Sequence, residues 1–130
     1  MIAFNIALNG RHVCTAGIRD FGVLTAMVTW VHRKPEQRRG RKRIEKELAA
    51  EVAGLDSVAK EHVKWLRRRL RIGDRLAIEI VKSDSPDTPK RRYRDDPRIV
   101  ERAKRRYFER LKKEYATDSV AASKRADRRR

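Results

Sequence analysis

The order of apolar and polar residues predicts strands in the first third of this 130-residue chain. In residues 2–8 every second side chain is strongly apolar, which is the period of a strand with one buried face. The dipeptide Asn9-Gly10 follows at once and suits a type I′ turn, so residues 11–18 are expected to return as an antiparallel partner. Residues 23–31 are rich in β-branched side chains and apolar on both faces, which predicts a third strand at the centre of a sheet.

The middle of the chain gives weaker patterns. Residues 44–55 alternate as a strand does, but their apolar positions also fit one face of a helix, and the strand is favoured. Residues 58–66 are predicted to form a short helix, because Asp56 or Ser57 can cap its first turn. Residues 76–80 alternate again after a Gly-Asp turn and predict a fifth strand.

The C-terminal part is predicted to consist of a linker, an amphipathic helix and a tail. Residues 83–96 are polar and contain two prolines, which indicates a linker. Asp96 and Pro97 supply the cap and the first-turn proline of a helix over residues 97–115, whose apolar stripe leaves most of its basic side chains on the other face. Residues 116–130 show no periodicity and are expected to be a disordered basic tail.

These elements predict an α+β fold: an antiparallel β-sheet or small β-sandwich of about five strands, with a short helix and a C-terminal amphipathic helix. Residues 1–82 are expected to form the β-rich core domain, which carries a basic loop over residues 33–46. Trp30 and Trp65 are assigned to its core, with a partly exposed anchor as the alternative for Trp65. The apolar stripe of the late helix needs a covering surface, either its own sheet or a second subunit, so a homodimer stays open.

The distribution of charge directs the functional hypothesis. The formal net charge is +17 at pH 7, and its excess lies in Arg-rich clusters. Such clusters attract polyanions through counterion release, and arginines beside an aromatic residue suit phosphate contact with base stacking. The alternative is an arginine bias of genomic origin on a solvated surface. The nucleic-acid-binding residues predicted on this basis are Arg38, Arg39, Arg41, Lys42, Arg43, Arg67, Arg68, Arg69, Arg91, Arg92, Tyr93, Arg102 and Arg105.

Motifs for catalysis or for a cofactor are not found in the sequence. It contains no phosphate-binding loop, no dinucleotide fingerprint, no hydrolase elbow and no zinc-protease motif, so neither an enzyme nor a cofactor is predicted. His12 and Cys14 would share one face of a strand, and His32 and His62 could complete a zinc site with them. These four residues are scattered without a short ligand pair, so a buried, inert cysteine is favoured and no metal site is predicted.

The composition also indicates a compartment. Cys14 is the only cysteine, which excludes an intrachain disulfide and favours the cytoplasm. No basic segment precedes the apolar residues 2–8, so no signal peptide is expected. No run approaches the ~20 apolar residues that span a bilayer, so no membrane partner is expected.

Two parts of the sequence resemble a group of small uncharacterised bacterial proteins. The resembling segments are CTAGI at 14–18 and DFGVL at 20–24, followed by GLDS at 54–57, HVKW at 62–65 and GD at 73–74. The resemblance implies one compact domain that ends near Val81, and it implies no activity, cofactor or binding residue. The basic loop over residues 33–43 and the Arg-rich tail look peculiar to this chain, so the resemblance does not make polyanion binding a shared role.

The sequence therefore predicts a small, basic, non-enzymatic protein that binds nucleic acid, RNA or DNA, largely through phosphate contacts. The alternative from a different class is a protein-interaction or immunity-type module that binds an acidic protein partner. In that case charge would set the association rate more than the affinity.

Overall fold

The computed structural model describes the backbone of residues 1–35 and 45–128, and side chains as far as residue 118. The chain divides into two units, Met1–Arg94 with the seven strands of the described residues, and Asp95–Arg130 with the helix. Two antiparallel sheets and a C-terminal helix confirm the predicted α+β class. Among the residues that the structure describes, no helix is both long and apolar enough to cross a membrane.

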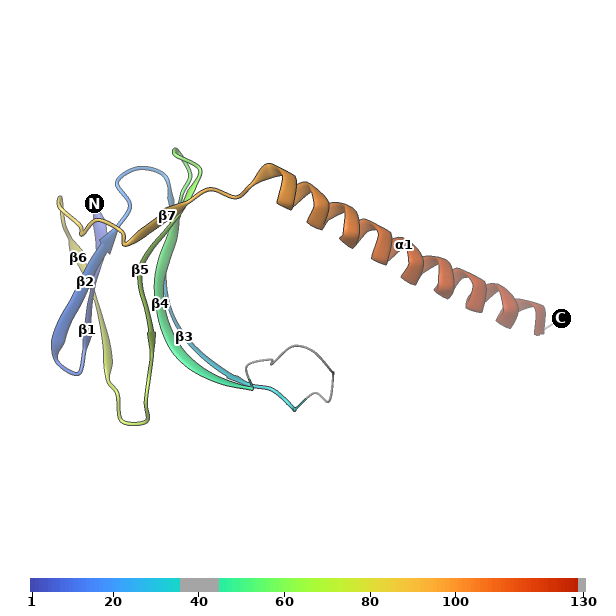
Figure 1. The fold of residues 1–130 in the computed structure, drawn as a ribbon, viewed down its shortest axis with the longest axis horizontal. Helices are drawn as coiled ribbons and strands as arrows, with labels where there is room; N and C mark the ends of the chain where they lie inside the picture. The colour runs from blue at the N-terminus through green and yellow to red at the C-terminus, as the bar shows by residue number, and fades with distance from the viewer. Residues whose placement is uncertain (36–44, 129–130) are drawn as a thin grey trace. The chain divides into compact units, whose positions relative to one another are not determined.

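The first sheet has three strands in the order β2-β1-β6 (Figure 1). Strands β1 (Ile2–Leu8) and β2 (Arg11–Gly17) form the predicted hairpin. Its turn residues Asn9 and Gly10 have φ values of 53° and 78°, the positive values that a type I′ turn requires. On its other side β1 pairs antiparallel with β6 (Leu76–Lys82), the strand expected over residues 76–80.

The second sheet has four strands in the order β3-β4-β5-β7. Its longest strands are β3 (Gly22–His32) and β4 (Lys46–Asp56), which pair along their whole length and curve together in Figure 1. Strand β4 confirms the strand alternative for residues 44–55. The prediction of a central position for residues 23–31 is wrong, because β3 lies at the edge of the sheet.

The predicted short helix over residues 58–66 is wrong as well. Strand β5 (Glu61–Arg69) occupies most of that range and pairs with β4. Asp56 does cap the preceding segment, since its Oδ1 accepts hydrogen bonds from the backbone N–H groups of Val58 and Ala59, both at 3.1 Å. That cap closes a turn and not a helix, because the burial of Val63 and Trp65 repeats at the period of two that a strand needs.

Most of the predicted linker over residues 83–96 also belongs to the β unit, which ends at Arg94. It contains the short strand β7 (Arg91–Tyr93), which pairs antiparallel with β5. Its residue Asp87 binds the backbone of β2, where Asp87 N–H donates to the carbonyl of Thr15 at 2.8 Å. With β5 and β7 the described chain holds seven strands, more than the expected five.

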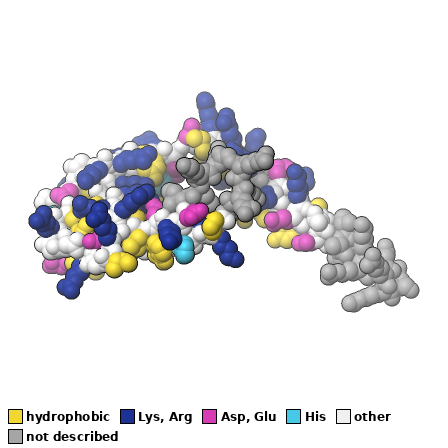
Figure 2. All heavy atoms as spheres, turned by 60° about the horizontal axis from the view of Figure 1, so that its bottom comes forward, with side chains coloured by type: hydrophobic (Ala, Val, Ile, Leu, Met, Phe, Trp, Pro, Cys, Tyr) yellow, Lys and Arg dark blue, Asp and Glu magenta, His cyan; other side chains and the backbone are white. Residues whose placement is uncertain are grey.

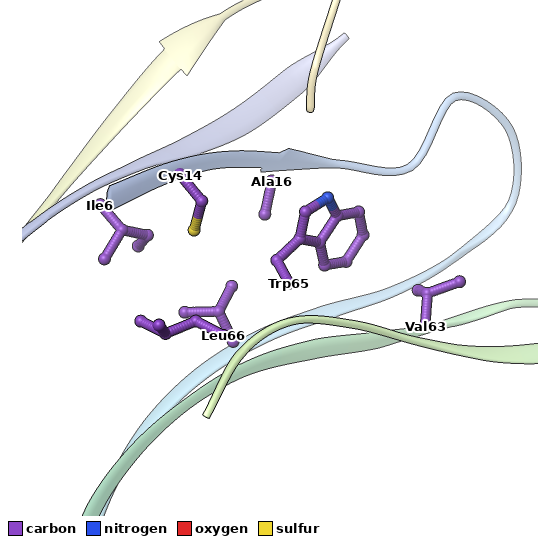
Figure 3. Packing of buried hydrophobic residues seen from close by; sticks show 7 residues of the cluster. Ile6, Cys14, Ala16, Val63, Trp65 and Leu66 are labelled. Carbon is purple, nitrogen blue, oxygen red and sulfur yellow. The ribbon is translucent and has the colours of Figure 1, made fainter. Parts of the chain in front are cut away.

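The hydrophobic core lies between the two sheets. Ile6, Cys14 and Ala16 from the first sheet face Val63, Trp65 and Leu66 from the second, as Figure 3 shows. The Trp65 side chain is 3% exposed, and its indole Nε1–H donates to the carbonyl of Asp87 at 2.7 Å. Trp30 is 59% exposed, so its predicted place in the core is wrong.

The expectation that Cys14 and His12 share one face of a strand is wrong. A bulge between Ile6 and Ala7 pairs Ile6 with Cys14 and Ala7 with His12, which puts the two β2 side chains on opposite faces. Cys14 is buried, and this burial, followed by the nearby charge of Asp87, raises the pKa of its thiol. The cysteine is therefore a core residue, as favoured above.

Helix α1 (Pro97–Arg128) begins as the sequence predicts. Asp96 Oδ1 accepts a hydrogen bond from the N–H of Arg98 at 2.9 Å, which is N-capping geometry. The helix continues past Tyr115, so the tail predicted to be disordered is helical as far as Arg128. Within its own unit the apolar stripe is uncovered: its exposed members among the described side chains include Ile99, Tyr107 and Tyr115.

Candidate nucleic-acid interface

The register of β5 and β7 brings four chemically distinct side chains together on the outer face of the second sheet. Val63 points into the core, so its neighbours His62 and Lys64 point to the opposite side of β5. His62 pairs directly with Tyr93, and Lys64 pairs directly with Arg91. We call His62, Lys64, Arg91 and Tyr93 the β5–β7 platform.

The two rings of the platform are stacked. The centroids of His62 and Tyr93 lie 4.9 Å apart, and their planes differ by 18°. The Arg91 guanidinium carbon lies 4.8 Å from the centroid of the Tyr93 ring, and the Lys64 Nζ atom lies 6.0 Å from it. Cations at these distances are attracted to the face of an aromatic ring. Two positive groups thus lie close to the stacked rings of Tyr93 and His62.

The cations of the platform face each other across the two strands. Lys64 and Arg91 are direct cross-strand neighbours, and like charges in this position destabilise a sheet. Lys64 is partly neutralised by Glu51, whose Oε1 lies 3.6 Å from its Nζ atom. Arg91 is exposed, and no ion pair involving it is found among the described side chains. An anion bound between these two groups would remove their repulsion.

Comparison of the chain with protein-family models, with curated proteins and with solved structures finds no match. The resemblance to a group of bacterial proteins therefore stays a prediction.

Other predicted arginines are engaged by acidic side chains. Arg67 contacts Glu51 at 2.7 Å and also pairs with Glu47. Arg92 lies on the face of β7 opposite Tyr93, and its Nη1 atom is 3.4 Å from Oε2 of Glu61. These ion pairs leave Arg67 and Arg92 less available to an external anion than Arg91.

The remaining predicted residues are dispersed over the molecule. Arg69 shares the outer face of β5 with Arg67, and Arg68 lies on the other face. Arg102 and Arg105 are exposed on α1, where Arg105 pairs with Glu101 at 3.4 Å. The predicted site residues that fall outside the described residues are Arg38, Arg39, Arg41, Lys42 and Arg43. Figure 2 shows Lys and Arg side chains spread over one face of the molecule, with Asp and Glu between them.

His62 and Lys64 are not among the nucleic-acid-binding residues predicted from the sequence, because a helix was predicted over residues 58–66. If residues 58–66 were a helix, the position of His62 and Lys64 relative to Tyr93 would depend on how that helix packs. In a strand, successive side chains alternate between the two faces, so His62 and Lys64 lie together on the outer face. Val63 and Trp65 are apolar and His62 and Lys64 are polar, so a strand with a polar outer face was readable from residues 62–65. The pairing of that face with Tyr93 was not readable, because it depends on the return of a distant segment.

A cavity of about 300 Å³ opens at one end of the β unit and is an alternative site. Asp56, Asp84 and Asp87 line it, together with Arg19 and Trp65. These carboxylates serve the fold: Asp56 caps a turn, Asp87 Oδ2 accepts a hydrogen bond from the N–H of Thr15 at 2.8 Å, and Asp84 Oδ1 lies 3.9 Å from the N-terminal amine. Among the described residues no group of three or more His, Cys, Asp or Glu side chains could hold a metal ion. The cavity offers no chemistry as distinct as that of the platform.

Proposed function

We propose that this chain is a cytoplasmic, non-enzymatic protein that binds single-stranded nucleic acid, largely through phosphate contacts, on the β5–β7 platform. Lys64 and Arg91 contact backbone phosphates, and a base stacks against the planar group formed by Arg91, Tyr93 and His62. Single strands suit such a surface because their bases are free to stack on aromatic or guanidinium planes. The stack is tolerant of sequence, since every base has a flat face.

The observation that carries this proposal is the placement of Lys64 directly opposite Arg91 beside the stacked His62–Tyr93 pair. Two cations kept side by side on the outer face of a sheet cost stability in the free protein. That cost is understandable if the surface meets an anion. The net charge of +17 supports the same conclusion, because it draws a polyanion toward the molecule from a distance.

The proposal predicts binding that is strongly dependent on salt. Fluorescence anisotropy with labelled 12-nucleotide RNA and DNA, single- and double-stranded, is measured between ~50 and ~300 mM salt, the range over which phosphate binding weakens. We expect tighter binding to the single strands and a linear fall of log K with log salt concentration.

Two outcomes would contradict the proposal. Undetectable binding at ~50 mM salt would exclude nucleic acid as the ligand. Equal binding of the oligonucleotides and of an acidic polypeptide of matched charge would favour the alternative, an interaction module for an acidic protein, because such binding would depend on net charge alone.

A further inference from the structure

The composition of β3 does not match its place at the edge of the sheet. Its residues are apolar on both faces, which is typical of a strand in the interior of a sheet whose two faces are covered. Val28 and Trp30 lie on one face and are 57% and 59% exposed, while Val23 and Met27 are exposed on the other. In the described residues β3 pairs only with β4. An apolar, unpaired edge is a template for another strand.

Other edges of the two sheets carry devices that discourage pairing. Along β2, Asp87 binds both backbone groups of Thr15, one through its N–H and the other through Oδ2, each at 2.8 Å. Strand β6 carries the charged residues Glu79 and Lys82. Strand β3 has no Asp, Glu, Lys or Arg from Gly22 to His32 and no proline, which are the usual protections of an edge.

The backbone groups of β3 that point away from β4 can be assigned from the ends of the ladder. The carbonyl of Phe21 accepts from Ser57 N–H at 2.9 Å, and Arg33 N–H donates to the carbonyl of Glu45 at 2.7 Å. Phe21 and Arg33, the residues that flank β3, both have odd numbers, and the register between them has no bulge. Because hydrogen-bonded and non-bonded pairs alternate in an antiparallel ladder, the even-numbered residues point their N–H and C=O groups outward. These residues are Gly22, Leu24, Ala26, Val28, Trp30 and His32.

We infer that β3 pairs antiparallel with β3 of a second copy of this chain and joins the two four-stranded sheets across a twofold axis. Full overlap of Gly22–His32 with its counterpart places Met27 opposite Met27 on the axis. Ala26 then lies opposite Val28, and Leu24 opposite Trp30, so even-numbered residues meet even-numbered residues. This is the combination that lets the outward N–H and C=O groups of both strands bond.

Of the described surfaces, the β3 edge is one where charge opposes a second copy of the chain least. Two chains of net charge +17 repel each other, and like charges brought face to face oppose association. Apart from the terminal His32, β3 carries no ionisable side chain, so the pairing brings no two charged β3 groups together. In the paired state β3 becomes an internal strand, and the unprotected edge is removed.

A cross-linking experiment tests the register on the full chain without nucleic acid. The variant Met27→Cys is expected to form a disulfide-linked dimer under mild oxidation, because the two Cα atoms on the axis lie about 4.5 Å apart in a non-bonded pair. The matched variant Thr25→Cys should stay unlinked, since its counterpart lies about 13 Å away along the strands. Failure of Met27→Cys to cross-link, or equal cross-linking of both variants, would overturn the inference.

Light scattering after size-exclusion chromatography tests the dimer itself. At about 100 μM chain, which populates dimers of micromolar dissociation constant, the natural sequence should show twice the 15.3 kDa of one chain. Val28→Lys should reduce this to one chain, whereas Ile80→Lys, a similar change at a 70% exposed site on β6, should not. A monomeric natural sequence, or a dimer that survives Val28→Lys, would overturn the inference. Circular dichroism shows whether Val28→Lys folds. If this variant does not fold, the cross-linking of Met27→Cys and Thr25→Cys decides whether the inference holds.

Discussion

Replacement of Lys64 and Arg91 together by glutamine is expected to weaken binding to a single-stranded oligonucleotide by about 100-fold. Each hydrogen bond to a charged phosphate contributes about 1.5 kcal/mol, and two of them multiply to roughly this factor. The slope of log K against log salt should also become shallower by about 1.4, because each phosphate that the protein neutralises on a single strand accounts for about 0.7 of that slope. Fluorescence anisotropy at several salt concentrations measures both quantities.

The control for this variant removes the same charge from the neighbouring residues. Arg92 and Arg94 both pair with Glu61, at 3.4 and 3.5 Å, and Arg92 lies on the opposite face of β7. The double variant Arg92→Gln, Arg94→Gln should therefore lose far less affinity than Lys64→Gln, Arg91→Gln. Equal losses in the two double variants would mean that only net charge matters, and the platform would then not be the binding site.

Replacement of Trp65 by alanine is expected to destabilise the β unit by about 3–5 kcal/mol, the usual cost of removing a large aromatic side chain from a core. Trp65 packs between the two sheets, and its indole N–H satisfies the carbonyl of Asp87 (Figure 3). The substitution leaves a cavity and an unpaired carbonyl, and it loosens the segment that leads into β7. Urea unfolding followed by circular dichroism gives the free energy.

The aromatic control for Trp65 is Phe21, which is 78% exposed in the turn before β3. Phe21→Ala should change the free energy of unfolding by no more than about 0.5 kcal/mol, as is usual for surface sites. A small loss for Trp65→Ala, comparable to that of Phe21→Ala, would show that the two sheets do not rely on this side chain.

Local signals predicted the parts of the fold that depend on neighbours in sequence. The Asn9-Gly10 turn gave the first hairpin because its positive φ values are an intrinsic property of those residues. Asp96 and Pro97 gave the start of α1 for the same kind of reason. The helix prediction for residues 58–66 is wrong because Asp56 caps a turn as readily as a helix. Only the pairing of β5 with β4 decides between the two structures.

The position of β3 and the composition of the platform could not be predicted from local patterns. Apolar side chains on both faces indicate a strand whose faces are covered, but they do not say which strands lie beside it or which chain supplies them. The sequence predicts Tyr93 as a binding residue because arginines flank it. In the structure Arg92 lies on the opposite face of β7, and Lys64 comes from another strand. Such sites are made by register, which joins residues far apart in the chain.

The location of bound nucleic acid can be measured directly by titrating the ¹⁵N-labelled full chain with a short single-stranded oligonucleotide and following the backbone amide resonances. If the β5–β7 platform is the binding surface, the largest shifts will fall on β5 and β7, around His62, Lys64, Arg91 and Tyr93. Shifts confined to α1, or spread evenly over all basic segments, would contradict the proposed function.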